Sequence, residues 1–83
     1  MQSLNRYITS ASSSTSITAL NTTVLTSPNC PTGVAVSPSI DSDIFGPVIV
    51  DIKATSTAFE VAIENQGGST ATVIVKTVCV ELT

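Results

Sequence analysis

Residues 59–82, FEVAIENQGGSTATVIVKTVCVEL, contain the clearest structural pattern in this chain. From Phe59 to Glu64, large apolar residues alternate with glutamate or alanine, which is the period of two expected for a half-buried strand. Asn65-Gln66-Gly67-Gly68 then indicates a turn, because glycine adopts positive φ at little cost. The segment from Thr70 to Leu82 would return as a second strand. The stretch therefore predicts a C-terminal β-hairpin.

The return strand is apolar on both faces. Its odd positions, from Ala71 to Cys79, are apolar or threonine, and its even face carries Ile74, Val78 and Val80. An antiparallel sheet normally leaves one face to water, and a domain of this size has too little protein to cover both. We therefore expect Ile74, Val78 and Val80 to form an interface between copies of the chain. The alternative is a compact sandwich in which this is simply the central strand.

The composition extends the β pattern to the whole chain. Valine, isoleucine and threonine make up 31 of the 83 residues, and branching at Cβ suits these side chains to a pleated surface. Only 11% of the residues are charged, against about 25% in an average soluble domain. The length fits one domain, which buries only about 60% of its unfolded surface. These features predict an all-β fold, a small antiparallel β-sandwich or barrel, with apolar surface left for another chain to cover.

Residues 1–16, MQSLNRYITSASSSTS, differ from the remainder because they are polar, serine-rich and without a clear pattern. We expect them to form an extended N-terminal arm outside a β domain of residues 17–83. Leu4, Tyr7 and Ile8 are the candidate anchors by which the arm would become ordered on a partner protein. The alternative is a flexible terminus, as chain ends often are.

Three further strands are expected before the C-terminal pair. Residues 17–26 and 48–55 have strand composition, and residues 34–36 form a short strand that Pro38 would end. A loop is expected over residues 37–47, between two prolines. In the strand at 48–55, Val50 and Ile52 are expected to face inward with Phe59, Val61, Ile63 and Val73.

Cys30 and Cys79 are the only cysteines. An even number of cysteines in a small β domain favours one disulfide, and two buried free thiols are the competing interpretation. Two cysteines without histidine do not make a zinc site. Asp41-Ser42-Asp43 is better explained as a solvated turn than as half of a calcium loop.

The sequence offers little for catalysis or for other ligands. It contains no histidine, so its serines have no histidine to activate them, and we expect neither an enzyme nor a cofactor site. The net charge is −3 and the three basic residues are isolated, so no nucleic-acid surface is expected. No apolar run approaches the roughly 20 residues of a spanning helix. The N-terminus lacks the apolar core of a signal peptide, so synthesis in a cytosol is expected.

Two resemblances follow from these residues. The spacing Cys30-Pro31-x-Gly33, Phe59-x-Val61, Asn65 and Val78-Cys79 resembles a small β module of bacterial and phage surface proteins, in which two half-cystines join the first and last strands. The whole layout resembles the small capsid decoration (cement) proteins of tailed phages. That resemblance implies an oligomer, often a trimer, that clamps neighbouring capsomers through an extended N-terminal arm.

The sequence thus predicts a structural binding protein that oligomerises, with a trimer expected, and stabilises a larger assembly. A phage capsid, with its major capsid protein as the partner, is the expected assembly, and the virion the expected location, after synthesis in the host cytoplasm. The alternative is a surface-displayed adhesive module of a fibre or filament, whose β surfaces would pair in an open series.

Overall fold

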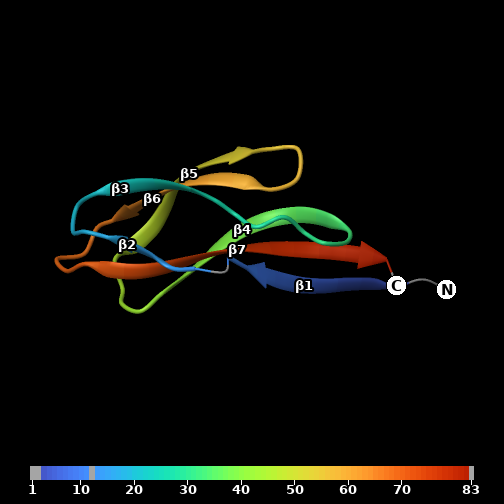
Figure 1. Ribbon diagram of the computed structural model, residues 1–83, viewed down its shortest axis with the longest axis horizontal. Helices are drawn as coiled ribbons and strands as arrows, with labels where there is room; N and C mark the ends of the chain where they lie inside the picture. The colour runs from blue at the N-terminus through green and yellow to red at the C-terminus, as the bar shows by residue number, and fades with distance from the viewer. Residues whose placement is uncertain (1–2, 12, 83) are drawn as a thin grey trace.

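Seven strands form where the chain is rich in β-branched residues, as a computed structural model that describes residues 3–11 and 13–82 shows (Figure 1). No helix occurs in these two ranges. Four residues lie outside the described ranges. They are residues 1, 2 and 12 of the expected arm and residue 83 of the expected β domain. The strands are β1 (Leu4–Ser10), β2 (Thr15–Ile17), β3 (Thr22–Thr26), β4 (Val34–Ser42), β5 (Pro47–Ala54), β6 (Phe59–Asn65) and β7 (Ala71–Leu82).

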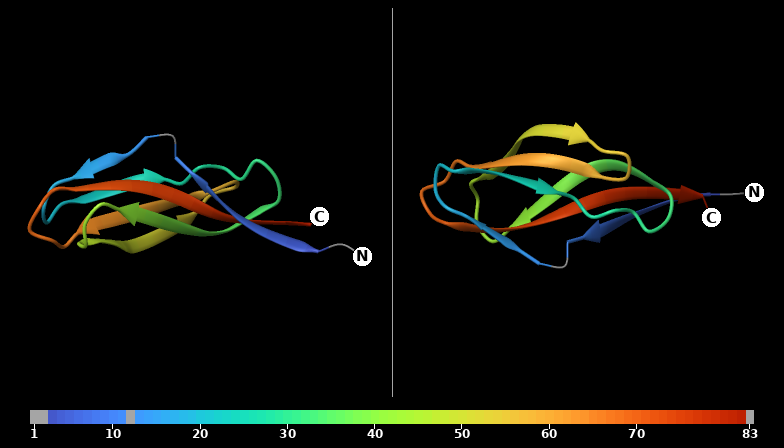
Figure 2. Two further views of the ribbon diagram at one scale, coloured as in Figure 1. Left: turned by 90° about the horizontal axis from the view of Figure 1, so that it is seen from below. Right: turned by 45° about the horizontal axis from the view of Figure 1, so that its top comes forward.

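The strands build two antiparallel sheets that face each other as layers (Figure 2). In the first, which we call sheet A, the long strand β7 lies in the centre. Strands β1 and β2 follow one another along one side of β7, and β4 lies along the other. The second, sheet B, has the order β3-β6-β5. The all-β, two-sheet antiparallel fold expected from the sequence is therefore confirmed.

The predicted C-terminal hairpin is wrong in its pairing, although both of its strands exist. β6 pairs with β3 and β5, whereas β7 pairs with β1, β2 and β4. Residues 66–70 thus carry the chain from one sheet to the other. The side chain of the buried Asn65 supports this crossing: its amide group donates to the carbonyls of Ile17 and Ser69, at 2.9 and 2.8 Å.

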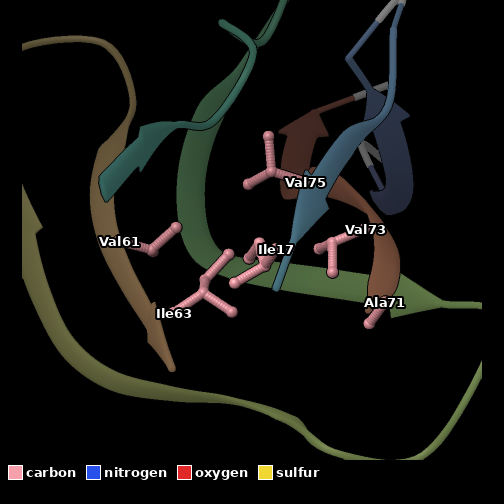
Figure 3. Packing of buried hydrophobic residues seen from close by; sticks show 6 residues of the cluster. All are labelled: Ile17, Val61, Ile63, Ala71, Val73 and Val75. Atoms are coloured by element: carbon pink, nitrogen blue, oxygen red, sulfur yellow. The ribbon is translucent and has the colours of Figure 1, made fainter. Parts of the chain in front are cut away.

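The core lies between β6 and the odd-numbered face of β7. Val61 and Ile63 of β6 point toward Ile17 and the first half of β7 (Figure 3). The buried cluster consists of Ile17, Val61, Ile63, Ala71, Val73 and Val75. The predicted inward orientation of Val61, Ile63 and Val73 is confirmed, and Phe59 packs against the cluster while remaining partly exposed.

Val50 and Ile52, expected in this core, are instead about half exposed. β5 is an edge strand of sheet B, and a bulge between Ile49 and Asp51 shifts its register against β6. The bulge breaks the alternation at Val50, whereas Ile52 lies opposite the buried Val61 on the inward face, as predicted, and stays half exposed because β5 is at the edge of the sheet. The packed core is consequently confined to β2, β6 and β7, with partial contributions from the strands beside them.

The N-terminal segment differs from the separate arm that the sequence suggested, because residues 4–10 form β1 within sheet A. β7 is 12 residues long, and its backbone groups need partners on both sides. β1 supplies those partners from Leu82 back to Lys76, and β2 continues the same side from Val73 to Ala71.

Two other boundaries also differ from the sequence-based expectation. The strand expected over residues 17–26 is divided by a turn at 18–21, where Leu20 has a φ of 65°. Pro38 lies inside β4 instead of ending it. β4 is an edge strand of sheet A, where a residue without an N–H can face outward at no cost to the ladder.

Candidate functional site: the outer face of sheet A

The face of sheet A that points away from the core is predominantly apolar. The β1–β7 register places Leu4, Arg6 and Ile8 opposite Leu82, Val80 and Val78 respectively. On the other side of β7, Val34 of β4 also lies opposite Val80. Residues directly opposite in antiparallel strands share a face. The apolar members, which we call the outer apolar face, are Leu4, Ile8, Val34, Ile74, Val78, Val80 and Leu82.

Several side chains of the outer apolar face are largely open to solvent. Leu4 is 73% exposed, Val34 67% and Leu82 64%. Ile8 is 53% exposed, whereas Val78 retains only 8% because it lies between Ile8 and Ser37 in the register. The expected interface residues Ile74, Val78 and Val80 thus lie on the side of β7 opposite the core. Sheet B covers the core side of the first half of β7. No second layer covers the opposite, outer side of sheet A in the described part of the chain.

Other exposed apolar side chains are dispersed over the molecule. Phe45, in the connection between β4 and β5, is fully exposed. Val24 lies on the outer side of β3, and Val50 and Ile52 lie on the edge strand β5. The outer face of sheet A is therefore distinguished by the clustering of its apolar side chains over three neighbouring strands.

Of the three expected anchor residues, which all lie in β1, Tyr7 makes contacts within the chain, whereas Leu4 and Ile8 are exposed. Tyr7 lies opposite Cys79, on the face of sheet A that points inward. Its hydroxyl donates to the carbonyl oxygen of Thr32 and accepts from the N–H of Thr32 at 3.2 Å. Tyr7 thus holds the 27–33 connection against the sheet, while Leu4 and Ile8 remain exposed on the opposite face.

A disulfide joins Cys30 to Cys79, as one of the two sequence-based alternatives predicted, with a Cα–Cα distance of 6.0 Å. It fixes the 27–33 connection over the inner face of the C-terminal half of β7. The hydroxyl of Thr77 donates to the carbonyl of Pro28 at 2.5 Å. Gly33, with a φ of +80°, passes so close that a Cβ would lie 2.2 Å from the carbonyl oxygen of Val80. This end of sheet A is therefore covered on its inner face by a loop instead of by sheet B.

Charged groups are few and mostly engaged. Lys76 forms an ion pair with Asp41 at 3.4 Å on the outer side of sheet A. The carboxylate of Asp43 accepts from the N–H of Thr72 at 2.8 Å, which ties the end of β4 to β7. Among residues 3–11 and 13–82, no group of three or more His, Cys, Asp or Glu side chains could hold a metal ion.

A shallow pocket of about 290 Å³ lies between the start of β4 and the 54–58 connection. Its walls are small apolar or hydroxyl side chains together with Cys30 and Phe59, without a charged group.

The described strands and connections include no helix long and apolar enough to cross a membrane. No family model, curated protein or solved structure matches the chain.

Proposed function

We propose that the protein is a non-catalytic structural binding protein that self-associates and stabilises a larger protein assembly. The single observation that carries this proposal is the clustering of Leu4, Ile8, Val34 and Leu82 on one uncovered face of sheet A. Contiguous exposed apolar surface of this kind marks protein interfaces. The low proportion of charged residues, 11%, supports a chain whose surface is partly buried by other proteins.

The free energies of burial and of association favour attachment through several copies over a single strong contact. Burying one large aliphatic side chain stabilises by about 1.5–3 kcal/mol, so four such residues contribute about 6–12 kcal/mol. Loss of rotational and translational freedom on association costs about 4–15 kcal/mol. The face alone therefore supports modest affinity, and several copies acting together would strengthen attachment without new contacts. A protein that binds only the assembled state stabilises that state by mass action.

A phage capsid is the assembly that we propose, with the virion as the location and the major capsid protein as the partner. The resemblance to small capsid decoration proteins supports this assignment, and a trimer is the stoichiometry that it suggests. The second candidate is a module of a surface fibre or filament. The free edge of β1 favours it, because pairing of β1 with a different edge of the next copy would propagate in an open series, unlike the pairing of β1 with itself.

Sedimentation velocity on wild type and on Val34→Lys and Leu82→Lys tests self-association through the outer apolar face. We expect the wild type to be oligomeric at tens of micromolar and both variants to sediment as smaller species, because a lysine would be desolvated in the interface. Val24→Lys is the matched control, since Val24 is 62% exposed on the outer side of β3. A monomeric wild type contradicts the proposal.

Mass spectrometry of purified virus particles tests the capsid assignment, and absence of the chain from them overturns it.

A further inference from the structure

β1 has a free backbone edge, and its pairing with β7 determines which of its residues direct their N–H and C=O groups outward. No described strand pairs with β1 on the side away from β7. The N–H of Ala11 donates to the carbonyl of Val75 at 3.0 Å. In an antiparallel ladder, hydrogen-bonded residues alternate with residues whose backbone groups point outward. The odd residues of β1 therefore bond to β7, and the N–H and C=O groups of the even residues point away from the sheet. Those even residues are Leu4, Arg6, Ile8 and Ser10.

The other edges carry features that hinder pairing with another strand, and β1 does not. β4 contains Pro38 and a bulge after Ala35. β5 begins with Pro47, contains a bulge after Ile49 and carries two charged residues. β2 and β3 are only three and five residues long. Bulges, prolines, charges and short length are the usual protections of edge strands. β1 has seven residues, no proline, no bulge and a single charge.

We infer that two copies of this chain join through antiparallel pairing of their β1 strands, which merges their two A sheets into one continuous sheet. This inference goes beyond the proposed association through the outer apolar face, because it adds a separate contact with a second copy at the edge of β1. The contact is a closed twofold pairing, in which the same edge is used by both copies. The even side chains of β1 belong to the outer face of sheet A, so the two outer apolar faces become continuous across the junction.

The phase and charge of β1 select one register. Outward-pointing even residues must meet even residues of the second copy. A register that places Arg6 opposite Arg6 of the second copy brings like charges together, which destabilises the pair. The register centred on Tyr7 pairs all seven residues of β1. It places Arg6 opposite Ile8 of the second copy, and it does so twice because of the twofold symmetry.

This cross-strand neighbour provides a test in which only the sign of one charge changes. Ile8→Glu would place a carboxylate opposite Arg6 of the second copy, whereas Ile8→Lys would place a second cation there. We expect the glutamate variant to dimerise about tenfold more tightly than the lysine variant at low salt. The difference should shrink at high salt because the charges are exposed. Repulsion between the net charges of the two chains would predict the reverse order of affinities, because glutamate adds to a net charge of −3 and lysine reduces it.

Sedimentation equilibrium measures the dissociation constants. Val24→Glu and Val24→Lys serve as controls and should differ little from each other, because Val24 lies on sheet B, away from β1. Adding Arg6→Glu to Ile8→Lys should restore dimerisation, because it recreates an opposite-charge pair with the signs exchanged. Circular dichroism and the unfolding midpoint establish that each variant is folded. The site is exposed enough, at 53%, to accept either charge within the monomer.

The outcomes separate this inference from the proposed function. Equal weakening in Ile8→Glu and Ile8→Lys, with no rescue by Arg6→Glu, overturns edge pairing. If Val34→Lys also dissociates the oligomer in that case, association through the outer apolar face stands by itself. A wild-type mass of three chains likewise excludes the closed twofold contact and retains self-association. A wild-type monomer overturns both.

Discussion

Asn65 is the residue at which the chain passes from sheet B to sheet A. Its side chain is fully buried, and each of its polar atoms has a partner. The amide nitrogen donates to the carbonyls of Ile17 and Ser69, and the amide oxygen accepts from the N–H of Gly67 at 3.0 Å. One side chain thus provides a partner for three backbone groups around the crossing, which an apolar residue of similar size could not do.

Asn65→Ala should therefore lower the free energy of unfolding by about 2–4 kcal/mol, since each buried backbone group left unpaired costs about 1–3 kcal/mol. Urea denaturation followed by circular dichroism measures the loss. Gln66→Ala is the matched control, because Gln66 is exposed and its side chain donates to the carboxylate of Glu64 at 2.9 Å. A loss of stability no greater than that of the control would show that water replaces the asparagine without cost.

At the scale of the strands, the sequence predicted faces better than partners. The alternation in Phe59–Glu64 and the apolar odd positions of β7 correctly identified Val61, Ile63 and Val73 as core. The same pattern cannot say whether two successive strands pair or stack, because a period of two fixes only the direction of each side chain. Asn65-Gln66-Gly67-Gly68 suits a hairpin as well as the crossing that the buried Asn65 amide supports.

The sequence did not predict β1 as a strand, for a related reason. Its apolar residues Leu4, Tyr7 and Ile8 fall on both faces, so no alternation marks it as a half-buried strand. Tyrosine, isoleucine and threonine in the middle of the segment were the available signal, since these residues favour strands. The uncovered even face of β7, by contrast, could be expected, because both faces of that strand are apolar and the chain is short. Whether a second copy covers that face stays a prediction.

The disulfide should stabilise the whole fold by restricting the unfolded chain, and it also anchors one connection, residues 27–33. A loop of about 50 residues closed by a disulfide is worth about 4 kcal/mol in the chain-entropy model. We expect the Cys30→Ala/Cys79→Ala variant to lose roughly this free energy of unfolding, with hydrogen exchange fastest at residues 27–33. Hydrogen bonds from Tyr7 to Thr32 and from Thr77 to Pro28 remain in the variant and set a lower limit on protection. Unchanged exchange in this connection contradicts the assignment.

The whole molecule is elongated, measuring 50 × 22 × 18 Å, and its radius of gyration is 13.8 Å. A compact domain of this length would have a radius of gyration of about 12 Å. The buried apolar cluster occupies the end of the molecule where β2, β6 and the first half of β7 meet. The other end is a three-stranded part of sheet A covered on one side by a disulfide-anchored loop. Such a shape buries less surface within the chain and leaves more for contacts between chains.

The stability of the folded chain should therefore depend on its concentration. If two chains fold and associate together, each tenfold rise in concentration stabilises the folded state by about 0.7 kcal/mol per chain. For a domain of this size that shift raises the thermal midpoint by about 3–5 °C. Differential scanning calorimetry from ten micromolar to one millimolar measures it. The Ile8→Lys variant should show a lower midpoint that depends less on concentration, because a lysine opposite Arg6 of the second copy weakens pairing. A wild-type midpoint that stays constant over this range would mean that one chain alone supplies all of the stability.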